Sequence, residues 1–108
     1  MTYKEVKTMI AGMGLPYTYY SFPNNIAPEP PYIVFNYPET DDLLADNSNY
    51  ANINTLNLEL YTASKDIETE ETIEAALNQN GFVYEKTEDY IRQEELFQIT
   101  YVSSFVKE

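Results

Sequence analysis

The chain contains no cysteine and no histidine. Without cysteine it can form no disulfide, no thiolate metal site and no thiol nucleophile. Without histidine, a serine or threonine nucleophile would need a lysine or a carboxylate as its base, and no motif supplies that arrangement. Carboxylate pairs, which a glycosidase needs, arise by chance among eighteen acidic residues. We therefore expect a protein that is not an enzyme and uses no cofactor.

Basic residues are scarce, six against eighteen acidic ones, which leaves a net charge of −12. This balance argues against binding of nucleic acid or an anionic membrane through a basic patch. None of the three glycines stands in a phosphate-binding motif, and no apolar run approaches the roughly 18 residues of a membrane span. A chain of 108 residues has room for one core. We expect one soluble, cytosolic domain spanning residues 1–108.

Aromatic residues, by contrast, are abundant, with eleven tyrosines and five phenylalanines in patterned segments. This content argues against disorder, the usual state of a strongly acidic chain. Four of the tyrosines fall in expected strands: Tyr17, Tyr19, Tyr32 and Tyr61. Their simplest interpretation is as sheet residues with the ring buried and the hydroxyl at the surface. The alternative is that they form subunit contacts, for which tyrosine is well suited.

Two helices are predicted. Thr2 and Glu5 have the spacing of a capping box, and apolar residues then recur at helical spacing at Val6, Met9, Ile10 and Met13. The stretch "GMGLP" ends this helix, because a glycine can adopt the left-handed cap and Pro16 cannot continue it. A second helix begins near Asp66, where the helix dipole favours the local run of acidic residues. Its apolar face is Ile73, Ala76 and Leu77, and Gly81 is its expected terminator.

Five strands complete the prediction, over residues 17–22, 32–37, 52–62, 82–91 and 95–106. The third is the clearest, because its leucines alternate with polar residues, and we expect Leu56, Leu58 and Leu60 to face Met9, Ile10 and Met13. The last two strands form an antiparallel hairpin. The predicted fold class is α+β, in the order helix-strand-strand-strand-helix-strand-strand, with two helices packed on a mostly antiparallel sheet.

An acidic connector, "ETDDLLADNSNY" (39–50), separates the second and third predicted strands. Its oxygen ligands suggest calcium, but the alternating spacing of a calcium loop and its glycine are missing, so we expect no metal site. A solvated loop that contacts a partner is the remaining hypothesis. Its candidate contact residues are Glu39, Asp41, Asp42, Asp46, Asn47, Asn49 and Tyr50.

Six short segments follow one another along the chain: "LPYTYYSF", "PPYIVFNY", "LLADNSNY", "LELYTASKD", "IEAALNQNGFVYEKTEDYI" and "EELFQITY". In this order they resemble the small tail terminator proteins of siphophages and prophages of Gram-positive hosts, also called tail completion or head-tail joining proteins. The resemblance runs from Leu15 to Tyr101, and none of its segments is a catalytic signature.

The resemblance implies a structural role. Such proteins form a ring, typically of six copies, that caps the finished tail tube and presents a surface to the head. The implied partners are further copies of the chain, the tail-tube protein and the head-connector protein, and DNA would pass through the ring without specific binding. The implied location is the host cytoplasm during assembly and then the head-tail junction of the virion. The acidic connector would face a partner or the lumen.

Two rival hypotheses stay open. The chain could instead be another head-tail connector, a head-closure protein or a tail-tube subunit, which would differ from a terminator in its assembly state. It could also be an acidic DNA mimic that inhibits a basic protein, which the charge of −12 suggests. Salt-sensitive binding to a basic enzyme would favour the mimic.

Overall fold

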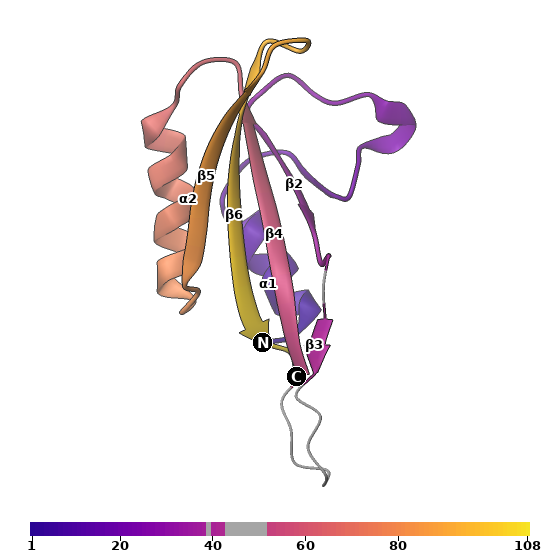
Figure 1. Cartoon of the computed structure of the whole chain (residues 1–108), viewed down its shortest axis with the longest axis vertical. Coiled ribbons are helices and arrows are strands. Elements are labelled where there is room, and N and C mark those ends of the chain that lie inside the picture. Colours follow the sequence, from indigo (N-terminus) through magenta and orange to yellow (C-terminus); the bar gives the residue numbers. More distant parts are fainter. Residues whose placement is uncertain (39, 43–51) are drawn as a thin grey trace, which may run out of the picture.

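A sheet in the order β1-β2-β4-β6-β5 organises the chain (Figure 1). The computed structural model describes residues 1–38, 40–42 and 52–108. The helices are α1 (Tyr3–Ala11) and α2 (Ile67–Gln79), and the strands are β1 (Tyr17–Tyr19), β2 (Tyr32–Asn36), β3 (Thr40–Asp42), β4 (Asn52–Thr62), β5 (Tyr84–Ile91) and β6 (Leu96–Val106). The α+β class and the predicted element order are confirmed, with the short β3 as an addition. Neither described helix is long and apolar enough to cross a membrane.

The two longest strands, β4 and β6, form the antiparallel centre of the sheet through ten residue pairs. On one side β2 pairs antiparallel with β4, and on the other β5 pairs antiparallel with β6 as the predicted hairpin. The exception to the antiparallel pattern is β1, which runs parallel to β2. Figure 1 places α1 behind the centre of the sheet and α2 beside β5, with both chain ends at the same end of the sheet.

Both helices cover the same face of the sheet. The predicted leucines of β4 are all buried there, in one core with Met9, Ile10 and Met13 of the first helical segment and with Ile73 and Leu77 of α2. The predicted packing of α1 is thus confirmed, and α2 shares the same core. The opposite face, called the open face below, carries Val34, Glu59, Tyr61, Gln98, Thr100 and Val102.

The ends of the helices follow the sequence signals. The Thr2 hydroxyl accepts a hydrogen bond from the Glu5 amide, and the Glu5 carboxylate accepts one from the Thr2 amide, which completes the predicted capping box. Of the two glycines considered for the end of α1, Gly14 has the left-handed conformation, with φ +81°. Asp66 caps α2 by accepting from the Thr69 amide, and Gly81 follows it with φ +79°.

Two strands differ from the prediction by more than two residues. The strand predicted over residues 17–22 ends at Tyr19, because Tyr20 has the left-handed conformation, with φ 69°, and turns the chain away. Within the predicted acidic connector, the backbone of Thr40–Asp42 pairs with β4 as β3. Aspartate is depleted in strands, so the local residue types contain no signal for β3.

A buried carboxylate fastens α2 to the hairpin. Glu70 is only 1% exposed and accepts hydrogen bonds from Lys65 at 2.7 Å and from Lys86 of β5 at 2.8 Å. Burial alone would raise the pKa of Glu70, but the two lysine ammonium groups outweigh burial and hold that pKa below its usual value. Neighbouring Glu74 accepts from Lys86 and from the Tyr101 hydroxyl, and burial raises the pKa of that phenol. The helix and the sheet are therefore joined by charge as well as by apolar packing.

Leu58→Ala tests the assignment of the core face. Leu58 is fully buried at the centre of the sheet, so its truncation is expected to lower the free energy of unfolding by about 2 to 5 kcal/mol. Val102→Ala on the open face, at a site 39% exposed, is the matched control and should cost markedly less. Urea denaturation of both variants measures the difference. A loss below about 1 kcal/mol for Leu58→Ala would contradict the assignment.

Glu70→Gln tests the ion-pair network. The variant keeps the shape but removes the charge that two lysines share, and the lysines remain partly solvated, so we expect a loss of about 1 to 3 kcal/mol near pH 7. Because the folded-state pKa of Glu70 is lowered, its contribution is present above the usual value of 4.5 and is lost as pH falls through the lowered value. The difference from the wild type should therefore shrink below about pH 4.5. Glu68→Gln, on the exposed first turn, is the control, and an equal effect there would contradict this interpretation.

Candidate functional site

The four candidate tyrosines lie on opposite faces of the sheet. Tyr32 and Tyr61 are direct partners in the β2–β4 register and lie on the open face. Tyr17 and Tyr19 stand opposite Ile33 and Phe35, whose side chains point into the core, so they belong to the helix-covered face. The sequence grouped these tyrosines together, but the structure divides them into two separate surfaces.

On the open face, Tyr32 and Tyr61 stack with ring centroids 5.0 Å apart and an interplanar angle of 19°. Phe22, from the loop between β1 and β2, meets Tyr32 edge-on at 5.3 Å. The Tyr61 hydroxyl donates to Glu59 and accepts from Gln98. Burial, assisted by the Glu59 carboxylate, raises the pKa of Tyr61 to about 12 despite the hydrogen bond from Gln98. Burial also raises the pKa of Tyr32, so both phenols are neutral at physiological pH.

The other tyrosine surface lies where α1 meets β1. Tyr19 packs edge-on against Phe35 at 5.4 Å and lies 5.7 Å from Tyr37, which in turn contacts Tyr3 of α1 at 4.4 Å. Burial raises the pKa of Tyr37 to about 12. Together with Lys7 these rings line a hollow of about 440 Å³. Tyr19 itself is 52% exposed, so the expected buried ring is found at Tyr32 but not at Tyr19.

Sequence reasoning missed several aromatic members of these surfaces. Phe22 and Tyr20 lie within the strand predicted over residues 17–22. The prediction therefore placed them in that strand and not in the loop that follows β1. Tyr37 follows Phe35 by two residues, so strand alternation could have placed it on the same face. Nothing in the local sequence shows that Tyr3 contacts Tyr37, because the two are joined only when α1 packs on the sheet.

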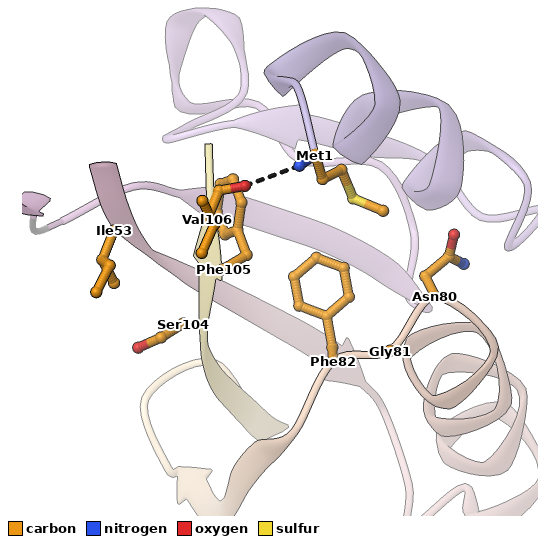
Figure 2. A pocket seen from close by; sticks show the side chains of 8 residues that line it. All are labelled: Met1, Ile53, Asn80, Gly81, Phe82, Ser104, Phe105 and Val106. Atoms are coloured by element: carbon orange, nitrogen blue, oxygen red, sulfur yellow. Dashed lines mark hydrogen bonds between the residues drawn. The ribbon is translucent and has the colours of Figure 1, made fainter. Parts of the chain in front are cut away.

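A second hollow, of about 450 Å³, lies at the end of the sheet where the two termini meet (Figure 2). Phe82 and Phe105 form its apolar side, with ring centroids 5.8 Å apart. The amino group of Met1 donates to the carbonyl of Val106 at 2.7 Å, which ties the first residue to the last strand. This hollow has no charged side chain in its lining, so its apolar surface is its main chemical feature.

The candidate connector residues are only partly described. Asp41 and Asp42 belong to β3, where their backbones pair with Ile53 and Asn52 of β4. Glu39, Asp46, Asn47, Asn49 and Tyr50 lie outside the described residues. The hypothesis that this segment contacts a partner or a lumen therefore stays a prediction.

The described residues present partly exposed aromatic surfaces. Within residues 1–38, 40–42 and 52–108 there is no group of three or more acidic side chains placed to hold a metal ion. The two hollows described above are lined mainly by aromatic and aliphatic residues from separate elements. Tyrosine-rich, partly exposed surfaces of this kind are typical of protein interfaces.

Comparison with known proteins identifies the fold but not a family. No protein-family model matches the sequence, and no curated protein matches it at a significant level. A solved chain from the "Virion of native gene transfer agent (GTA) particle" superposes with a TM-score of 0.61 at 13% sequence identity. The likeness covers 96% of this chain and 89% of that one. The protein therefore shares its fold, over nearly its whole length, with a chain of that virion.

Proposed function

We propose that this protein is a structural subunit of a phage-like virion and that it acts as a tail terminator. In this role a ring of copies, six by resemblance, caps the tail tube and joins it to the head connector. The observation that carries the proposal is the fold shared, nearly end to end, with a chain of the gene transfer agent virion. The sequence resemblance to tail terminators supplies the more specific assignment.

The arrangement of the tyrosine surfaces supports assembly into a ring. A ring with cyclic symmetry above two-fold needs two different surfaces on each subunit, one for each neighbour. This chain has aromatic surfaces on opposite faces of the sheet, one around Tyr61 and one around Tyr19. Each includes partly exposed rings that a neighbouring subunit could cover.

The residues of the outer strand β5 argue against contact between copies by pairing of a neighbouring copy's strand with β5. All of its central residues are exposed, and four of them are charged: Glu85, Lys86, Glu88 and Asp89. Charged side chains on an edge strand oppose its pairing with another sheet. Contacts between copies are thus better supported through side chains on the faces than through the β5 edge.

The charge distribution suits a ring through which DNA passes. Two of the six basic residues, Lys65 and Lys86, are engaged by Glu70, Glu74 and Glu88. Little positive charge is left to attract phosphates, so DNA would not be held by such a ring. The DNA-mimic hypothesis rests on the same negative charge. Only an experiment on the assembled particle separates the mimic from the terminator.

Deletion of the gene from the genome that encodes it tests the proposed function. We expect heads that fill with DNA, together with tails that have abnormal lengths or are not joined to heads, because a tube of stacked identical rings has no intrinsic end. Electron microscopy of the particles measures tail length and joining, and expression of the wild-type gene from a plasmid is the control. Normal tails joined to full heads would contradict the terminator role.

A second experiment, on the purified protein, separates the terminator from a tail-tube subunit. A terminator should form a single ring at the tube end, whereas a tail-tube subunit forms extended stacks. Native mass spectrometry of the purified protein mixed with isolated tubes distinguishes one ring from a stack. If the deletion has no effect on particles and the protein binds a basic enzyme in a salt-sensitive way, the DNA-mimic hypothesis replaces the proposal.

A further inference from the structure

The open face contains an acidic hollow of about 360 Å³ where three distant segments meet. The loop after β1 supplies Tyr20 and Phe22, the paired strands supply Tyr32, Glu59 and Tyr61, and the turn between β5 and β6 supplies Glu94. Figure 1 shows the β5–β6 turn, which supplies Glu94, at the end of the sheet opposite the chain termini. We propose that this hollow is a docking site for an arginine-bearing basic segment of a partner protein.

Charge complementarity is the main argument for a basic occupant. Two carboxylates, Glu59 and Glu94, line the hollow, and none of its lining residues is basic. Burial of the ring raises the pKa of Tyr32, and the Glu94 charge is close enough to add to this rise. The described residues give neither carboxylate an ion-pair partner within 4.0 Å, in contrast to the carboxylate of Glu70. Arg92, in the same turn, is exposed and does not line the hollow.

The carboxylate of Glu59 is held in position by its neighbours. One oxygen accepts from the Tyr61 hydroxyl at 3.0 Å and the other accepts from the Asn57 amide at 3.2 Å. Each carboxylate oxygen has a second acceptor position, so a guanidinium could add its hydrogen bonds without displacing these donors. A carboxylate fixed in this way loses little freedom when it binds a cation, which favours affinity.

The aromatic walls favour a guanidinium over a simple ammonium ion. A guanidinium is planar, stacks on aromatic rings and pairs with a carboxylate through two hydrogen bonds. Tyr32 is nearly buried in its stack with Tyr61, whereas Tyr20 is 71% exposed and available to cover an inserted side chain. The volume is at the lower end of the range for small-molecule pockets, which suits one or two side chains.

The backbone at the edge of the hollow is strained. Tyr20 has φ 69°, a left-handed conformation that is unfavourable for a residue with a side chain and that clusters at binding sites. Its amide donates to the carbonyl of Phe35 at 2.8 Å, which holds the strained residue against β2. The fold thus maintains an exposed tyrosine beside the two carboxylates at a cost in stability. This inference does not depend on the proposed virion function.

Titration of the ¹⁵N-labelled protein with a short peptide of alternating arginine and glycine tests the proposal by NMR. We expect saturable shifts centred on Tyr20, Glu59, Tyr61 and Glu94. The variant E59Q/E94Q should bind at least about tenfold more weakly, which corresponds to about 1.4 kcal/mol. The control E85Q/D89N removes the same amount of charge from exposed β5 residues and should change affinity less than about twofold, as expected for screened charges outside the site. If E59Q/E94Q does not fold, E94Q alone, in the exposed turn, should still weaken binding.

Five results would overturn the proposal. Equal weakening in both double variants would mean attraction by net charge alone. Shifts centred outside the hollow, or no saturable binding, would remove the site. Equal binding of the same peptide with glutamate in place of arginine would exclude recognition of positive charge. Concentration-dependent shifts at the hollow without any peptide would identify a second copy of the chain as the occupant.

Discussion

The pairing of β4 with β6 is the constraint on which the other features depend. Ten residue pairs fix the register of these strands, and side chains alternate between faces along both of them. Leu58 therefore lies opposite Tyr101 on the helix-covered face, while Tyr61 lies opposite Gln98 on the open face. A slip by one residue would move the leucines of β4 to solvent and Tyr61 into the core. The core and the candidate surfaces are thus set by one register.

The two faces of the sheet differ in what covers them. One face is closed by α1 and α2, whose apolar residues form a single core with the strands. The other face carries polar and aromatic side chains and is covered in part by the loop that contains Phe22. Tyrosine serves on both, because its ring packs on neighbours while its hydroxyl remains available for hydrogen bonds. A protein that assembles with partners through its faces needs this combination of a closed core and accessible rings.

Acidic charge has two opposite uses in the molecule. At Glu70 a carboxylate is buried and neutralised by Lys65 and Lys86, so that it fastens α2 to the hairpin. At Glu59 and Glu94 the carboxylates have no such counterion among the described residues and line an accessible hollow. Because the chain has only six basic residues, its own lysines cannot neutralise every acidic site. The negative charge at Glu59 and Glu94 is therefore left for the basic partner that we propose.

Local sequence alone determined the capping box of α1, the Asp66 cap of α2, the whole of β4 and the terminal hairpin. These features depend on residues within one or two helical turns of each other, or on strict alternation of apolar and polar residues along a strand. Both patterns can be read from the linear sequence. Tertiary structure decided the parallel pairing of β1, the formation of β3 and the division of the tyrosines between two faces. It also brought Phe22, Glu59 and Glu94 to one hollow from three distant segments. Such groupings depend on strand order and on the paths of the loops, and neither is recorded in the spacing of neighbouring residues.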